Sequence, residues 1–188
     1  MALKLNVIIV STRPGRVGPK IGAWMHRFAT DRAGFEAELV DLDAFALPVF
    51  DEPKHPRFQD YQHSHTQAWS ASVASADAFV FVSPEYNYMP PPSFVNAVDF
   101  LFREWNYKVA GLVTYGGPLG GARAAQMEKL MLTSVKVMTV PEGVSIPLPS
   151  HMNDKGEFNA SPPIEASAKA MLEEMVKWAG ALKPLRAS

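Results

Sequence analysis

The segment from Leu5 to Val10, LNVIIV, runs without a break into the segment from Ser11 to Lys20, STRPGRVGPK. A short, nearly continuous run of Val, Ile and Leu is typical of a strand buried on both faces, as in a parallel sheet. The polar residues, glycines and arginines that follow have two interpretations. They form either a solvent-exposed turn or a loop that wraps around an anion.

Strand-like and helix-like segments alternate along the rest of the chain. This alternation predicts an α/β fold, with a doubly wound, five-stranded parallel sheet and helices on both faces. The 188 residues fit one domain, 1–188. We expect a long irregular loop at 44–62, a turn-rich excursion at 150–161 and a frayed tail at 184–188. The strands are expected at 5–10, 35–42, 78–82, 109–115 and 135–146, and the helices at 20–32, 66–76, 94–102, 119–132 and 163–182.

Three unusual segments come directly after the first, third and fourth predicted strands. They are STRPGRVG (11–18), SPEYNYMPPPS (83–93) and GGPLGGAR (116–123). Ligands of such sheets bind at the carboxyl ends of the strands, near the point where the strand order reverses. We therefore expect all three segments at one edge of the sheet, where they form a binding site.

The first of these loops has the composition of a phosphate cradle. Gly15 and Gly18 let the backbone approach a ligand, and a helix N-terminus offers unpaired amides. Ser11 offers a hydroxyl, while Arg13 and Arg16 offer planar groups that fit a phosphate. Neither the G-x-G-x-x-G pattern nor a P-loop is present, so the loop suits one terminal phosphate better than a dinucleotide.

The other two loops suit a flat ligand. The prolines after Tyr86, Asn87 and Tyr88 stiffen the backbone, and the aromatic rings supply stacking surface. In the third loop, four glycines in six positions permit close backbone approach, although one or two would suffice for a tight turn. A proline-rich linker and a simple turn remain the structural alternatives.

Taken together, STRPGR, PEYN and YGG followed by a second GG resemble the NAD(P)H-dependent FMN reductase family, over residues 5–144. The resemblance implies a flavodoxin-like fold. Val10 stands where many members have Gly, and Val95 stands where many have Lys. The resemblance also implies FMN contacts. The phosphate would be held by Ser11, Arg13, Arg16 and Gly18, the ribityl chain and isoalloxazine by Pro84, Glu85, Tyr86 and Asn87, and the pyrimidine edge by Tyr115, Gly116 and Gly117.

The same resemblance implies an oxidoreductase. NADPH or NADH would pass a hydride to flavin N5, and a quinone or similar small acceptor would then take it at the same site, which gives ping-pong kinetics. FMN carries this chemistry, so no catalytic side chain is expected. A flavin-binding electron carrier, or a redox-responsive partner protein with little turnover, is the alternative.

Composition excludes several other classes of protein. The net charge of −1 gives no overall field for nucleic acid or an anionic membrane. With no cysteine there is no disulfide or thiolate site, which fits the cytoplasm. His63 and His65 have no suitably spaced carboxylate, so we expect no metal. The aromatic stretch at 100–107 is either core or part of a homodimer seam, and the resemblance favours a homodimer.

Overall fold

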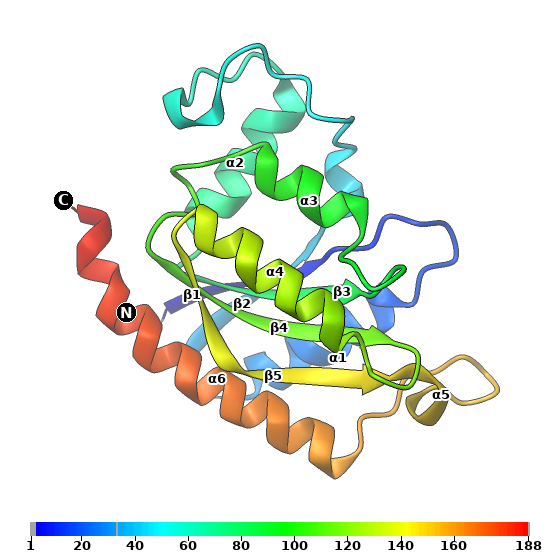
Figure 1. Ribbon diagram of the computed structural model, residues 1–188. Helices are drawn as coiled ribbons and strands as arrows, with labels where there is room; N and C mark the ends of the chain where they lie inside the picture. The colour runs from blue at the N-terminus through cyan, green and yellow to red at the C-terminus, as the bar shows by residue number, and fades with distance from the viewer. Residues whose placement is uncertain (1–2, 33, 188) are drawn as a thin grey trace.

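The computed structural model describes residues 3–32 and 34–187, which form a parallel sheet between two layers of helices (Figure 1). Its spatial order is β2-β1-β3-β4-β5, and every pair of neighbours is parallel. The predicted flavodoxin-like fold is confirmed. The strands are β1 (Leu3–Ile9), β2 (Phe35–Asp41), β3 (Ala78–Pro84), β4 (Lys108–Gly116) and β5 (Val137–Pro147).

Each face of the sheet has its own apolar core. On one face, Leu5 and Val80 pack with α1 and α6, which contribute Ile21 and Met171. On the other face, Phe79 and Phe81 pack with α2, α3 and α4. Such two-sided burial explains why the central strands are almost wholly apolar. The helices are α1 (Gly18–Thr30), α2 (Ser64–Ser75), α3 (Pro92–Asp99), α4 (Ala122–Ser134), α5 (Leu148–His151) and α6 (Pro162–Leu182).

The long connection between β2 and α2 is ordered by side chains. It contains two 3-10 turns, Leu42–Phe45 and Pro56–Phe58. Asn96 of α3 donates from Nδ2 to the Pro48 carbonyl and accepts the Phe50 amide at 2.9 Å. Buried Glu52 accepts the amides of Gln62 and His63. The predicted irregular loop is therefore pinned to α3 and to the start of α2.

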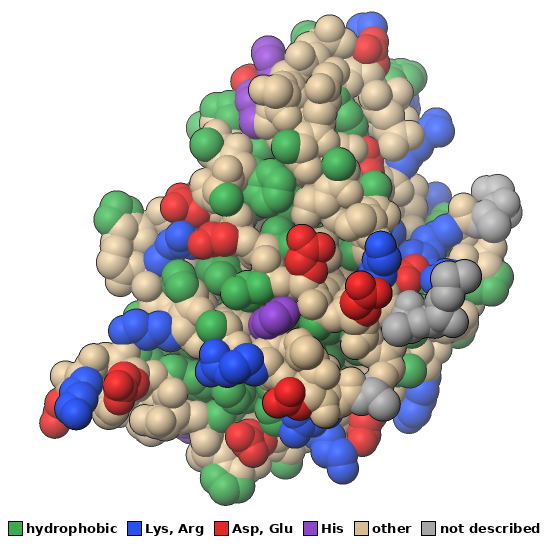
Figure 2. Space-filling model, turned by 180° about the vertical axis from the view of Figure 1, so that it is seen from behind, with side chains coloured by type: hydrophobic (Ala, Val, Ile, Leu, Met, Phe, Trp, Pro, Cys, Tyr) green, Lys and Arg blue, Asp and Glu red, His purple; other side chains and the backbone are tan. Residues whose placement is uncertain are grey.

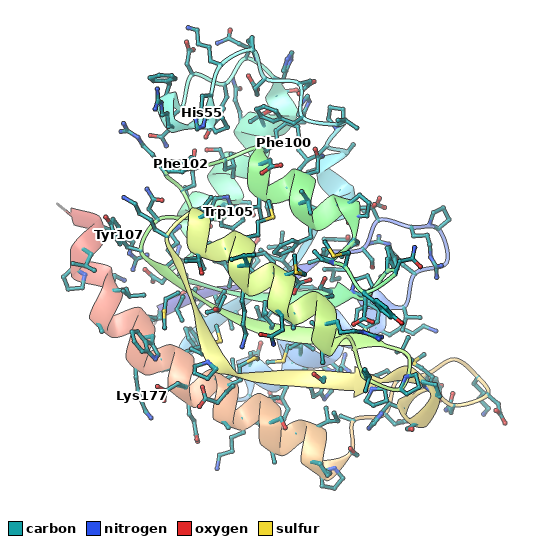
Figure 3. The ribbon with its side chains drawn as sticks, viewed as in Figure 1. His55, Phe100, Phe102, Trp105, Tyr107 and Lys177 are labelled. Carbon is teal, nitrogen blue, oxygen red and sulfur yellow. The ribbon has the colours of Figure 1, made fainter. Side chains whose placement is uncertain are left out.

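The aromatic stretch after α3 belongs to the core. The predicted helix 94–102 ends early, at Asp99, because the chain turns there and inserts its next large side chains under the sheet. Phe100 and Trp105 are fully buried (Figure 3), and the Trp105 ring lies 5.0 Å from that of Phe79. These residues are therefore core, whereas Phe102 and Tyr107 of the same stretch are half-buried.

Two segments in the last third of the chain, 150–161 and 184–188, differ from their predicted secondary structure. The excursion at 150–161 begins with the short helix α5 and closes with a bridge between Met152 and Phe158. The predicted frayed tail is instead a 3-10 helix, Lys183–Ala187, because Arg186 pairs with Asp77 at 2.9 Å. Ser188 lies outside the described residues.

The outer strand β5 pairs irregularly with β4. Ala110 lies opposite Thr139, whereas Leu112 lies opposite Gly143, so β5 holds two extra residues at this point. Pro141 is one of the residues in the bulge. Beyond it the register is regular again as far as Gly116 and Pro147, and the end of β4 is therefore well placed beside the site.

Candidate functional site

The three predicted loops do meet at the carboxyl edge of the sheet. A small cavity of about 90 Å³ lies between them. It is the size of a few water molecules, so a larger ligand must lie across its mouth. Residues of all three loops line it, together with one residue of α5: Arg13, Arg16, Val17, Pro84, Glu85, Tyr86, Tyr115, Gly116 and Leu148.

Buried contacts fix the first loop against the third. The Tyr115 hydroxyl donates to Ser11 Oγ at 3.1 Å, and both side chains are buried. Burial raises the pKa of Tyr115 to about 12, so the phenol keeps its proton. A Cβ on Gly18 would lie 2.5 Å from Ser11 Oγ and 2.9 Å from the Tyr115 hydroxyl. Gly18 therefore lets α1 begin directly against this pair.

Arg16 is engaged with carboxylates of the protein itself. Its guanidinium donates to both oxygens of Asp41, at 2.6 and 2.9 Å, and to Asp43 at 3.2 Å. It also donates to the Ser11 carbonyl at 2.7 Å. Such a bidentate pair is strong and directional. Arg16 thus ties the first loop to the end of β2, and its predicted contact with a phosphate stays a prediction.

Arg13 differs from Arg16 in having no carboxylate partner within residues 3–32 and 34–187. Its guanidinium carbon lies 5.8 Å from the centre of the Tyr86 ring. The positive charge of Arg13 also tends to lower the pKa of Tyr115. An uncompensated cation therefore borders the cavity where the phosphate is predicted.

In the second loop, Glu85 holds the start of α4. Its carboxylate accepts Nε of Arg123 at 2.9 Å and the backbone amides of Arg123 and Ala124 at 3.1 and 3.4 Å. These amides are among those a helix N-terminus leaves without a partner. Burial alone would raise the pKa of Glu85, but the hydrogen bonds from Arg123 and Ala124 hold it below its ordinary value. The Glu85 side chain is therefore occupied, and its amide donates to the Tyr115 carbonyl at 2.9 Å, which leaves the Glu85 carbonyl for a ligand.

The segment after Glu85 is a tight turn in a strained conformation. Tyr86 and Met89 exchange both backbone hydrogen bonds, at 2.9 and 3.0 Å. Asn87 and Tyr88 both have positive φ, 51° and 72°. Asn tolerates this region, whereas an aromatic residue there is unusual. The turn leaves Tyr88 exposed, with the guanidinium of Arg123 over its ring at 3.7 Å.

The glycines of the third loop fall into two groups. Gly120 and Gly121 have φ of 58° and 84°, and a Cβ on either would lie within 2.9 Å of the neighbouring strand ends. By contrast, a Cβ on Gly117 would meet nothing within 4 Å, and one on Gly116 would make only ordinary contacts. Packing of the described residues thus requires Gly120 and Gly121 but leaves Gly116 and Gly117 open toward solvent.

Sequence reasoning missed a buried pair beneath the second loop. The Ser83 hydroxyl donates to Glu128 of α4, and both side chains are fully buried. Burial raises the pKa of Glu128 to about 7. Its second oxygen has no partner among the described residues. Glu128 lies among apolar residues of α4, and nothing in its position in the sequence indicated that it would bind Ser83.

A larger groove of about 850 Å³ borders the same edge. Thr12 belongs to the first loop, and the remaining lining comes from the connection after β2 and from the proline segment and α3. Val49, Phe50 and Val95 give it an exposed apolar rim. Sequence reasoning marked the connection as long and irregular but could not place it beside α3.

The paired histidines lie at the start of α2 rather than at this site. His65 Nε2 is 3.0 Å and His63 Nε2 is 3.8 Å from Asp51 oxygens. Asp51 is thus a carboxylate partner that the sequence spacing had not revealed. Within residues 3–32 and 34–187, no group of three or more acidic or His side chains is arranged to hold a metal. No described helix is long and apolar enough to cross a membrane.

A family model described as NADPH-dependent FMN reductase matches residues 3–148. The chain belongs to this family. It is 38% identical over 148 residues to the NAD(P)H-dependent FMN reductase of Schizosaccharomyces pombe, covering 78% of this chain and 74% of the relative. It is 32% identical over 158 residues to an NAD(P)H-dependent FMN reductase of Saccharomyces cerevisiae, covering 78% and 82%.

Solved structures agree with this FMN reductase on the fold. The flavoenzyme NAD(P)H:(acceptor) oxidoreductase FerB of Paracoccus denitrificans aligns with a TM-score of 0.74 at 19% identity, over 96% of this chain and 99% of that one. A flavodoxin, described as a WrbA-like protein, of Agrobacterium tumefaciens aligns with a TM-score of 0.60 at 17% identity, over 96% and 99%. The expectation of an enzyme that uses FMN and NAD(P)H is confirmed by the family assignment.

Proposed function

We propose that this FMN reductase binds FMN across the mouth of the small cavity, with its phosphate at the first loop. The observation that carries the proposal is the meeting of an unpaired cation, Arg13, with two glycines, Gly116 and Gly117, that packing does not require. A phosphate needs the cation, and a flat ring needs backbone without side chains. The other predicted contacts are Ser11, Arg16, Gly18, Pro84, Glu85, Tyr86, Asn87 and Tyr115.

The site residues divide into two kinds. Ser11, Gly18, Tyr115 and Arg16 hold one another and the end of β2, so they shape the pocket. Arg13, the Tyr86 ring beside it and the open faces of Gly116 and Gly117 are left to touch a ligand. Bound FMN supplies two-electron transfer between a nicotinamide and an acceptor, and the protein supplies position and a dry surface.

We further propose a ping-pong reaction in which the nicotinamide and a small acceptor, such as a quinone, use one face in turn. A quinone oxidoreductase of Solanum tuberosum, 39% identical over 94 residues, supports this acceptor class. The exposed apolar rim of the neighbouring groove suits an uncharged ring. In the absence of cysteine, the cytoplasm is the proposed compartment.

Steady-state kinetics test the order of the reaction. With FMN-loaded protein, NADPH and a benzoquinone, we expect parallel lines in double-reciprocal plots at several quinone concentrations. Intersecting lines would show that both substrates bind together and would overturn the ping-pong proposal. Bleaching of the flavin by NADPH without turnover on quinone would favour the electron-carrier alternative instead.

We also propose a homodimer that buries the apolar rim. Val49 is 88% exposed, and Phe50, Met89 and Val95 lie exposed around the same edge. Apolar side chains gathered on one face are typical of an interface. Light scattering of the FMN-loaded protein is expected to return twice the mass of the chain, and the mass of one chain would contradict the proposal.

A further inference from the structure

A second groove lies at the opposite edge of the sheet from the predicted FMN site. It has a volume of about 660 Å³, and part of its lining stands at the starts of two strands. Lys108 begins β4, Lys136 directly precedes β5, and Arg186 follows α6. Because β4 runs nine residues from Lys108 to Gly116, the two edges are about 25 Å apart.

Positive charge is concentrated in this groove. Its lining carries five cationic residues and one acidic residue, although the whole chain has a net charge of −1. Figure 2 shows Lys and Arg side chains mixed with Asp and Glu over one face of the molecule, as expected for a net charge near zero. The cationic residues are Arg57, Arg103, Lys108, Lys136 and Arg186.

Of these cations, Arg186 pairs with Asp77 at 2.9 Å, whereas the single acidic residue of the lining is engaged elsewhere. Glu104 is buried, and its carboxylate accepts Tyr61 Oη at 2.9 Å, Ser70 Oγ at 2.7 Å and Gln59 Nε2 at 3.1 Å. Within residues 3–32 and 34–187, no carboxylate contacts the side chain of Arg57 or Arg103. The Lys136 amine donates only to a hydroxyl, that of Tyr107, at 3.2 Å.

Beneath these side chains lies a buried lysine without a carboxylate. Lys108 Nζ donates to the carbonyls of Val73 and Ala74 at 2.7 and 3.3 Å. Burial lowers the pKa of Lys108 to about 8, and the charge of Arg186 adds to this. The charges of Asp77 and Glu104 act in the opposite direction, and the Phe79 ring lies 5.4 Å from Nζ. A buried ammonium without a direct carboxylate partner is costly, and an anion in the groove would compensate it.

The backbone around the groove is strained at two positions. Tyr107 and Lys136 both have a φ of 59°, and the Tyr107 amide donates to the Lys136 carbonyl at 2.9 Å. A left-handed residue just after a helix is usually Gly, which has no Cβ to clash. Here the chain keeps two long side chains, and both line the groove. Strain of this kind is retained where the side chain is needed.

We propose that this groove binds a small ligand with two or more linked phosphate groups. Arg57 and Arg103 contact the phosphate oxygens with planar guanidinium groups that match phosphate geometry, and Lys136 adds an ammonium group. Phe102 and Tyr107 (Figure 3) lie beside them as a surface for an attached base. The linked phosphates come either from an inorganic polyphosphate or from a nucleoside polyphosphate. The proposal is independent of the FMN site.

Titration calorimetry on the full, FMN-saturated protein tests the groove. We expect one saturable site for inorganic tripolyphosphate, at least tenfold tighter than for inorganic phosphate, with the flavin spectrum unchanged. ATP binding more tightly than tripolyphosphate would assign a nucleotide, and equal affinity would assign the phosphate chain alone. No saturable binding of either probe, or a changed flavin spectrum, would overturn the proposal.

Two variants and a matched control separate a built site from general surface charge. Arg103→Ala and Lys136→Gly should each weaken tripolyphosphate binding about tenfold. Lys136→Gly should also leave the unfolding midpoint equal or higher, since Gly relieves the left-handed backbone. Lys177→Ala on α6 (Figure 3), whose amine pairs with Glu174, should leave the affinity unchanged. Equal weakening by the Lys177 variant would contradict a specific site.

Discussion

At the scale of single residues, two arginines of one loop have different roles. Arg16 is bound to Asp41, Asp43 and a carbonyl, whereas no described carboxylate contacts Arg13. Both looked equally suited to a phosphate in the sequence, because residue type and spacing do not reveal a partner 25 positions away. The structure therefore predicts that replacing Arg13 changes FMN affinity, whereas replacing Arg16 changes folding stability.

Arg13→Ala should weaken FMN binding by about ten- to a hundredfold, which is the contribution of a charge-assisted hydrogen bond. Its thermal unfolding without FMN should stay near that of the parent. Arg16→Ala should instead lower the free energy of unfolding by about 1–3 kcal/mol, since it leaves Asp41 without its partner. Fluorescence titration with FMN and denaturant unfolding measure the two effects. Loss of FMN affinity in the Arg16 variant alone would contradict the assignment.

The glycines of the third loop give a second residue-scale prediction. Gly120→Ala forces a side chain onto left-handed backbone 2.7 Å from the Ile146 amide, and it should cost about 2–4 kcal/mol of stability. Gly117→Ala meets open space and should leave unfolding within about 0.5 kcal/mol. It should nevertheless weaken FMN binding, because the methyl group stands where the ring approaches. Unchanged FMN affinity would show that the flavin ring does not lie against Gly117.

At the scale of elements, α4 is attached to the end of β3 at two levels. Glu85 accepts amides at its N-terminus, and Glu128 accepts the Ser83 hydroxyl about a turn and a half further along. Both contacts join α4 to the strand that carries the second loop. The position of that loop therefore depends on a helix that lines neither of the two pockets at this edge.

Glu128 makes stability depend on pH. Its folded pKa, about 7, is above its ordinary value of 4.5, so the folded protein holds a proton that the unfolded chain releases. This contribution is fully present below about pH 4.5 and is lost as pH rises through about 7, with a total of about 3 kcal/mol. Denaturant unfolding of Glu128→Gln, which keeps the acceptor for Ser83, should lack this decline. If the free energy of unfolding of the variant fell with pH just as steeply, the decline would come from another titrating group.

At the scale of the whole molecule, hydrophobic pattern was the most informative signal. Alternating apolar runs predicted all five strands, and the parallel arrangement they implied placed the three loops at one edge, while the strand order comes from the structure. Partners distant in the sequence could not be predicted, because pairs such as Arg16 with Asp41 or Ser83 with Glu128 depend on packing. The aromatic stretch was ambiguous for the same reason, since core and interface use the same residue types.

Two substitutions separate core from interface. Trp105 is fully buried, and its indole nitrogen donates to the Val98 carbonyl at 3.2 Å. Trp105→Ala should therefore cost about 3–5 kcal/mol of folding stability. Val49→Asp changes an exposed side chain, so folding should be unaffected while the proposed dimer dissociates. Denaturant unfolding and light scattering on both variants measure these effects. If the Trp105 variant kept its folding stability but became monomeric, Trp105 would belong to the interface rather than to the core.

The bulged pairing of β5 limits how these molecules can join. An outer strand with regular, unpaired amides invites another chain to extend the sheet. Here Pro141 has no amide hydrogen to offer, and the two surplus residues interrupt the spacing that an incoming strand would have to match. Growth into a continuous ribbon of sheets is thereby discouraged on that side. This edge of the sheet is thus protected from fibrillar association without a covering domain.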